Sequence, residues 1–227
     1  DMLVYGMGEQ AFMQILTLMK RGVPFAGLHN IPQTAYLKSL DEKIHPLQGV
    51  QEQLLPSHEA CVSDKRTFAR AFRMIEEASN TWNSDRLLQP HGEQMLVVNP
   101  PYPPPDEDMA DLPYELPYMR QPHPRYRKKP AIPAWEMIRF SVNSHRGCFG
   151  GCSFCTISAH QGKFISSRSE KSILNEVENI TGMADFKGYI SDLGGPSANM
   201  YKMKGKDLNI CAKCKRPSCL FPVTCPN

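Results

Sequence analysis

The sequence predicts an α/β fold, in which short strands alternate with amphipathic helices. Near its start, the apolar stretch Met2–Tyr5 meets a glycine and then apolar residues at helical spacing, which is the pattern of a strand followed by a helix. Between residues 137 and 195, a strand, a glycine-rich loop, a helix and a second strand follow one another. That order predicts a βα unit of a parallel sheet.

Two amphipathic helices are expected in the first half of the chain. The first contains apolar residues three and four positions apart and ends near Gly22. The second starts with Ser63 as its N-cap and runs to about Asn80. Its apolar face, which we expect to lie in the core, consists of Phe68, Ala71, Phe72 and Ile75.

Prolines dominate the middle of the chain. The sequence contains 20 prolines, and most lie between Pro100 and Pro133, after a strand expected at Met95–Val98. Because proline lacks an amide donor and restrains its neighbours, the segment Asn99–Pro105 is expected to be an extended connector. The basic cluster Arg125–Lys129 is interpreted as a solvated linker, with a phosphate or RNA contact as the alternative.

The βα unit in the second half is expected to start with a strand over Met137–Asn143. Ser167 and Glu170 then fit a capping box that opens a helix. A second strand over Gly188–Leu193 ends at Gly194–Gly195, and ligands of such sheets bind where the strands end. The buried stripe of the helix is predicted to consist of Ile173, Leu174, Val177 and Ile180.

Three cysteines lie on one short loop at C-x3-C-x2-C spacing, namely Cys148, Cys152 and Cys155. A structural zinc ion takes four closed ligands, usually as separated pairs. Three thiolates on a tight loop instead suit a cubane iron–sulfur cluster with one iron left open. Gly150 and Gly151 lack a Cβ atom, so the backbone can approach such a cluster closely.

A second cysteine group, with C-x2-C-x4-C-x5-C spacing, lies near the end of the sequence. An auxiliary iron–sulfur cluster and a structural zinc ion both accept four cysteines. The irregular spacing and the neighbouring redox motif favour the cluster, and disulfides are the third interpretation. The group consists of Cys211, Cys214, Cys219 and Cys225.

Composition narrows the function classes. The chain has 227 residues, a net charge of +3 and eight cysteines. That charge is too small to indicate nucleic-acid binding by itself, and no apolar run approaches the ~18 residues of a membrane span. Cysteines without a secretion signal favour metal chemistry in a reducing, cytoplasmic compartment. Cys61 is interpreted as a buried, unreactive thiol and Arg168 as a solvated charge.

The cysteine loop, with Phe154 just before its third cysteine, resembles the signature of the radical S-adenosylmethionine (radical SAM) superfamily. The stretches Ile132–Asn143, Arg146–Cys152 and Ile190–Tyr201 resemble the YgiQ-like branch, a largely uncharacterised group. The resemblance runs through almost all of the chain and is densest from about residue 96 to residue 227.

This resemblance implies the start of a radical SAM partial (β/α) barrel, preceded by the tail of a Rossmann-like, cobalamin-binding-like unit. We expect residues 1–56 to end that N-terminal domain and residues 57–130 to form a helical insertion and the proline-rich linker. Residues 131–200 would form the first βα units, and residues 201–227 a metal-binding segment. The chain is therefore interpreted as an internal fragment of a longer protein, which we expect to be inactive alone.

The resemblance also implies a reaction. Such enzymes hold a 4Fe-4S cluster on the three cysteines and reductively cleave SAM to a deoxyadenosyl radical, which takes a hydrogen atom from a substrate. Phe154 would pack near the adenine, and the backbone of Gly194–Gly195 would meet the methionyl amino group, with Asp192 as a further contact. Pro196 stands where the family usually has a glutamate.

The expected partner is an external electron donor of the flavodoxin or ferredoxin type. The substrate is unknown, and related branches modify RNA and proteins. The alternative from another class is a binding module for nucleic acid or protein, in which zinc staples the cysteine groups. That alternative predicts bound zinc, no sulfide and no response to SAM.

Overall fold

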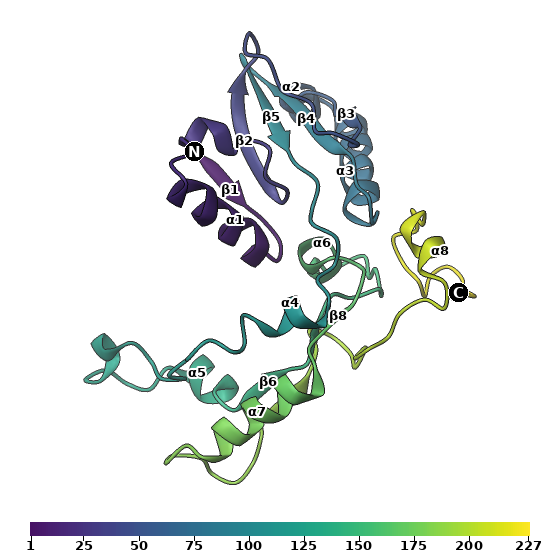
Figure 1. Ribbon diagram of the computed structural model, residues 1–227. Coiled ribbons are helices and arrows are strands. Elements are labelled where there is room, and N and C mark those ends of the chain that lie inside the picture. Colours follow the sequence, from purple (N-terminus) through teal and green to yellow (C-terminus); the bar gives the residue numbers. More distant parts are fainter. The chain divides into compact units, whose positions relative to one another are not determined.

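The computed structural model describes residues 1–227, which divide into two compact units (Figure 1). The first unit comprises residues 1–104, 149–164 and 204–227, and the second comprises residues 105–148 and 165–203. None of the helices combines the length and the apolar character that crossing a membrane requires.

A five-stranded sheet forms the centre of the first unit (Figure 1). The α/β class and the two strands predicted in this region are confirmed. The Rossmann-like tail is not confirmed, because only β3 and β4 pair in parallel and the other three pairings are antiparallel. In sheet order, the strands are β1 (Met2–Val4), β2 (Thr34–Ser39), β5 (Gln94–Val98), β4 (Arg86–His91) and β3 (Glu52–Leu54).

Short helices accompany this sheet, and α2 and α3 lie beside β4 (Figure 1). The N-cap of α3 is Asp64, not the predicted Ser63. The Asp64 carboxylate accepts hydrogen bonds from the amides of Thr67 (2.9 Å) and Arg66 (3.3 Å), so it satisfies two of the free donors at the helix start. The helices are α1 (Glu9–Lys20), η1 (Phe25–Leu28), α2 (His58–Ser63), α3 (Lys65–Ser79), α6 (Ile157–Gln161) and α8 (Leu208–Ala212).

The apolar face predicted for α3 is only partly buried. Ala71 is buried, whereas Phe68, Phe72 and Ile75 are exposed, so the prediction that this face lies in the core is wrong for the three larger side chains. The reason is that periodicity identifies an apolar face but not what covers it. The buried cluster of this unit lies instead around α1 and η1 and consists of Ala11, Leu28 and Ile31.

Arg86, on strand β4 next to the edge strand β3, is fully buried. Its guanidinium donates to the side-chain oxygens of Asn99 (2.9 Å) and Asn30 (3.1 Å) and to the carbonyl of His45 (2.7 Å). It also pairs with the Glu52 carboxylate at 3.2 Å. A buried cation is tolerated only when its donors are satisfied in this way, so Arg86 ties four separate segments together.

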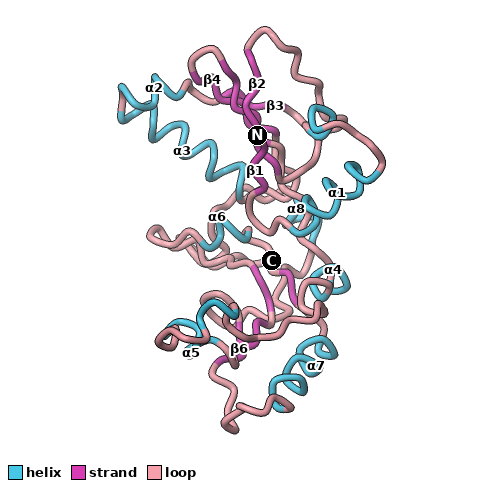
Figure 2. The backbone as a smooth tube through the Cα atoms, turned by 90° about the vertical axis from the view of Figure 1, so that its left-hand side faces the viewer, coloured by secondary structure: helices cyan, strands magenta, loops and turns pink.

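The second unit contains the predicted parallel βα unit. Strand β6 pairs in parallel with β9, with Ser141 opposite Asp192 and Asn143 opposite Gly194, and α7 lies against β6 (Figure 2). Strand β7 pairs antiparallel with β8. The elements are α4 (Glu107–Asp111), η2 (Pro124–Tyr126), α5 (Pro133–Ile138), β6 (Ser141–Asn143), β7 (His145–Arg146), β8 (Ser166–Ser167), α7 (Glu170–Thr181) and β9 (Asp192–Gly194).

Three local predictions for this unit are wrong. The segment expected to be a strand from Met137 begins as helix α5, because Pro133 has the fixed φ that suits a first helical turn. The capping residue of α7 is Ser169, whose hydroxyl accepts from the Ser172 amide, so Ser167 forms no capping box. Leu174 is exposed, and the core consists of Phe140, Val142, Ile173 and Ile180.

We predict that Arg86→Ala destabilises the sheet of the first unit. Removing the cation leaves the partly buried Glu52 carboxylate and the buried side-chain oxygen of Asn99 without their partner, which costs roughly 3–5 kcal/mol for a broken buried ion pair. Amide hydrogen exchange in β4 and β5 measures this loss as a lower free energy of opening.

The matched control is Arg73→Ala on α3. Arg73 is exposed and pairs with Glu77 one helical turn away at 2.8 Å, so its loss should cost less than about 0.5 kcal/mol. Equal effects of the two substitutions would contradict the assignment of Arg86 as the buried anchor of the sheet.

Candidate functional site

The parallel pairing of β6 and β9 brings the residues after both strands to the same end of the sheet. The amide of Ser144 donates to the carbonyl of Gly194 at 2.7 Å. Gly195 then passes so close to His145 that a Cβ atom there would lie 2.1 Å from the imidazole ring. Glycine is therefore required at position 195, because the His145 ring leaves no room for a side chain.

His145 is a packing residue of this strand end. Its Nδ1 lies 3.0 Å from the Ser144 hydroxyl, and its Nε2 accepts from the Met200 amide at 3.3 Å. Burial lowers the pKa of His145, against the opposing effect of a hydrogen bond with the backbone of Ala198. Both ring nitrogens are engaged, so His145 has no nitrogen free for a metal ion.

Cys148 is buried in the second unit at the same end of the sheet. Its Sγ lies 3.2 Å from the Ser197 hydroxyl, in the turn that follows Gly194–Gly195. Asp192 is exposed on β9. The structure thus brings one of the three predicted cluster ligands next to the glycine pair that sequence reasoning assigned to SAM.

Cys152 and Cys155 belong to the first unit. They form one turn, in which the Cys155 amide donates to the Cys152 carbonyl at 3.0 Å. Cys152 is exposed and Cys155 is half-buried, while the aromatic ring of Phe154 beside them is 89% exposed. This turn therefore presents its thiols and its aromatic side chain to solvent.

All eight cysteines carry free thiols. No three His, Cys, Asp or Glu side chains lie together in the arrangement that holds a metal ion. The cysteines of the loop fit an iron–sulfur cluster by donor type and by spacing.

Ser218 anchors the loop that carries Cys152. Its hydroxyl donates to the Gly150 carbonyl at 2.7 Å, and it accepts from the amides of Leu220 and Phe221 at 3.0 Å each. The next amide, that of Cys219, donates to the Phe149 carbonyl at 3.0 Å. Two consecutive residues of the C-terminal segment thus hold the backbone of the loop in the first unit.

The second cysteine group lies in that same C-terminal segment. Burial raises the pKa of the Cys219 thiol. The Lys163 ammonium lowers this pKa, and the other three thiols of the group raise it. Lys163, which sequence reasoning missed, is 2% exposed. A lysine after a glycine on a loop gives no sequence signal of burial.

Arg168 is 1% exposed, so its interpretation as a solvated charge is wrong. It donates to the carbonyls of Asn143 (2.8 Å) and Ser172 (3.0 Å), pairs with Glu176, and stacks on the Tyr114 ring at 3.9 Å. Burial lowers its pKa. Arg168 therefore fixes the end of β6 against α7, from which the segment to Cys148 starts.

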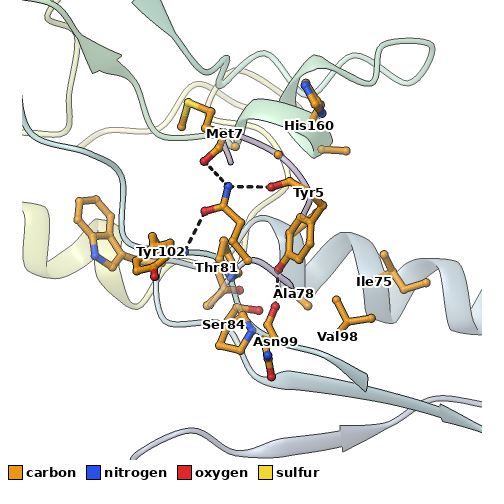
Figure 3. Close-up of a pocket in the computed structure, with 18 of the residues that line it drawn as sticks. Tyr5, Met7, Ile75, Ala78, Thr81, Ser84, Val98, Asn99, Tyr102 and His160 are labelled. Carbon is orange, nitrogen blue, oxygen red and sulfur yellow. Dashed lines mark hydrogen bonds between the residues drawn. The ribbon is translucent and has the colours of Figure 1, made fainter. Parts of the chain in front are cut away.

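A cavity of about 290 Å³ lies in the first unit between β1, α3 and α6 (Figure 3). Apolar side chains dominate its wall, and no cysteine lines it. Gln33 closes one side: its side-chain amide donates to the carbonyls of Tyr5 (2.8 Å) and Met7 (2.5 Å) and accepts from the Tyr102 amide (3.3 Å). Burial raises the pKa of Tyr5, whose hydroxyl donates to the Asn99 carbonyl.

We predict that Gly151→Ala loosens the contact between the loop and Ser218. The new Cβ would lie 2.7 Å from the Pro217 carbonyl oxygen and 2.8 Å from the Ser218 Cβ. Such overpacking costs typically ~1–3 kcal/mol, in addition to the roughly 1 kcal/mol cost of a positive φ for alanine. Amide exchange at Cys219 reports the opening of this contact.

Gly162→Ala provides the matched control, because Gly162 also has a positive φ but no atom within 4 Å of an added Cβ. It should show the backbone cost alone. If both substitutions accelerate exchange at Cys219 to the same extent, the packing of Gly151 on Ser218 is not what holds the loop.

The chain is similar in sequence to several UPF0313 proteins. The chain is 56% identical over 227 residues to a UPF0313 protein of Porphyromonas gingivalis and 54% identical over 240 residues to one of Bacteroides thetaiotaomicron. A UPF0313 protein of Geobacter sulfurreducens is 44% identical over 225 residues. These alignments cover 99–100% of the chain but only 35–38% of the relatives, so the chain spans about a third of their length.

No solved structure matches the chain. The radical SAM N-terminal family matches residues 1–141, which is more than half of the sequence. The superfamily predicted from the cysteine loop is therefore confirmed from a different part of the chain. The chain belongs to the radical SAM N-terminal family and is homologous to the UPF0313 proteins.

Proposed function

We propose that the chain is part of a radical SAM enzyme, in which Cys148, Cys152 and Cys155 bind a 4Fe-4S cluster. The observation that carries the proposal is the parallel pairing of β6 with β9, which places Cys148 beside Ser197 in the turn after Gly194–Gly195. Ligands of parallel α/β sheets gather at this end of the strands.

The three thiols suit a cluster with an open iron. Three cysteines at this spacing leave one iron without a protein ligand, where the amino and carboxylate groups of SAM would bind. His145, the nearest alternative ligand in the sequence, is engaged at both ring nitrogens. This supports a site in which the protein supplies only thiolates.

The residues proposed to contact SAM are Gly194, Gly195, Asp192 and Phe154. Gly194 has only the Asp192 carboxylate within 4 Å of an added Cβ, at 3.6 Å, so space for a ligand exists along this backbone. Pro196 cannot supply the carboxylate expected in the family, whereas Asp192, at the start of the same strand, is exposed and has its carboxylate 3.6 Å from the Cβ position of Gly194, so it can do so. Phe154, also exposed, has a ring face free to cover an adenine.

When reduced, the cluster would supply the electron that cleaves SAM to a deoxyadenosyl radical. The residues of this chain would position the cofactor: Arg168 and His145 fix the strand end that leads to Cys148, and Ser218 fixes the loop that carries Cys152. Reduction requires an external one-electron donor of the flavodoxin or ferredoxin type. RNA and proteins are the substrate classes that we propose to test first.

We predict that the full-length protein, reconstituted anaerobically with iron and sulfide and reduced with dithionite, releases 5′-deoxyadenosine from SAM. Cys152→Ala should reduce this release to that of a protein-free reaction, because the cluster loses a ligand. Liquid chromatography with mass spectrometry measures the product, and iron and sulfide analysis shows the loss of the cluster.

Cys61→Ala is the control, since Cys61 lies outside both cysteine groups and its thiol contacts only the Pro56 carbonyl and the Gln89 amide, at 3.9 Å each. It should release as much product as the unmodified protein. Undiminished release from Cys152→Ala would contradict the assignment of the cluster to the loop.

A further inference from the structure

The C-terminal segment folds its four cysteines with short-range backbone hydrogen bonds. The Cys214 amide donates to the Cys211 carbonyl at 3.0 Å, just after helix α8. The Cys225 amide donates to the Cys219 carbonyl at 2.7 Å. Two turns thus link the group in two pairs, although no three of its thiols are gathered as around a bound metal, and none of the four is in a disulfide.

A buried ammonium points into this group. Lys163 is 2% exposed, and its Nζ lies 3.7 Å from the Cys214 Sγ and 2.7 Å from the Arg216 carbonyl oxygen. No carboxylate lies within ion-pair distance of it. Burying an ammonium is costly unless negative charge lies nearby, and a neutral thiol is only a weak acceptor. The environment of Lys163 therefore calls for thiolates.

We propose that Cys211, Cys214, Cys219 and Cys225 hold a tetrathiolate metal centre, with Lys163 as its buried counter-cation. Four thiolates around a divalent zinc ion, or around an oxidised 4Fe-4S core, leave a net charge of about −2. The ammonium of Lys163, beside the Cys214 sulfur, would offset part of that charge. A bound metal would stabilise several thiolates side by side.

A hydrogen bond to the Cys211 sulfur and the close backbone beside it support the same centre. The side-chain amide of Asn227 donates to the Cys211 Sγ at 3.2 Å and to the Asp207 carbonyl at 3.0 Å. A Cβ on Gly205 would lie 2.5 Å from the Cys211 Sγ, so the backbone closes over this sulfur. Amide donors and close backbone contacts are typical surroundings of metal-bound thiolates.

The position of the centre gives it a role at the cysteine loop. Ser218 and Cys219 donate to the carbonyls of Gly150 and Phe149, and Cys219 is one of the proposed ligands. Metal binding would therefore order the segment that holds the backbone leading to Cys152. This role rests on the proposed function of the loop, whereas the metal centre does not.

The test uses the full-length protein with Cys148, Cys152 and Cys155 all replaced by alanine, so that the loop cannot bind a cluster. Zinc and iron are measured by mass spectrometry after anaerobic purification, together with acid-labile sulfide. We expect about one metal centre per chain, lost when Cys214→Ser and Cys219→Ser are added and kept when Cys61→Ser is added instead.

Either zinc without sulfide or iron with sulfide supports the centre and identifies its class. Absence of both metals from the triple variant overturns it. The proposed function is judged separately, from the iron and sulfide that the unmodified protein holds in excess of the triple variant. No excess would contradict the cluster on the loop and leave the second centre unaffected.

Two further arms test the roles of Lys163 and Ser218. In the triple variant, Lys163→Gln should speed the loss of metal to a chelator. Lys171→Gln, on the exposed side of α7, should not. Equal rates would overturn the role of Lys163 as counter-cation.

Removing the metal should accelerate amide exchange at Cys219 and Leu220, and unchanged exchange would contradict the ordering of the loop.

Discussion

Polar anchoring of the backbone is the constraint on which the cysteine loop depends. From Phe149 to Cys155 the loop has one large apolar side chain besides Phe149, and that one, Phe154, is exposed. Such a loop buries too little apolar area to order itself, so its carbonyl groups must be held from outside. Ser218 does this with one hydroxyl that donates to the loop and accepts from two amides of its own turn.

Buried cations also anchor backbone carbonyls in both units. Arg86 joins strands and loops of the first unit, Arg168 joins β6 to α7 in the second, and Lys163 points at the second cysteine group. Each donates to at least one backbone carbonyl, which restricts where that segment can lie. An unsatisfied buried donor costs more free energy than a satisfied one gains. These contacts therefore favour a single arrangement of the segments, although the segments have little hydrophobic core.

The sequence was most informative where function dictates residue type. The spacing of Cys148, Cys152 and Cys155 predicted a superfamily that the comparisons confirm, and periodicity predicted the parallel pairing of β6 with β9. The sequence was least informative where tertiary contacts decide whether a side chain is buried. The charge of Arg168 and Lys163 gave no sign that both are buried. Glycine at position 195 was ascribed to a ligand, although the ring of His145 already requires it.

The central claim is that the loop carries an open-iron cluster, and electron paramagnetic resonance tests it most directly. The full-length protein, reconstituted anaerobically and reduced, would be measured with and without SAM. We expect a cubane signal that changes shape when SAM is added and that is absent when Cys148, Cys152 and Cys155 are replaced by alanine. A cubane signal that is indifferent to SAM, or that survives this replacement unchanged, would contradict the claim.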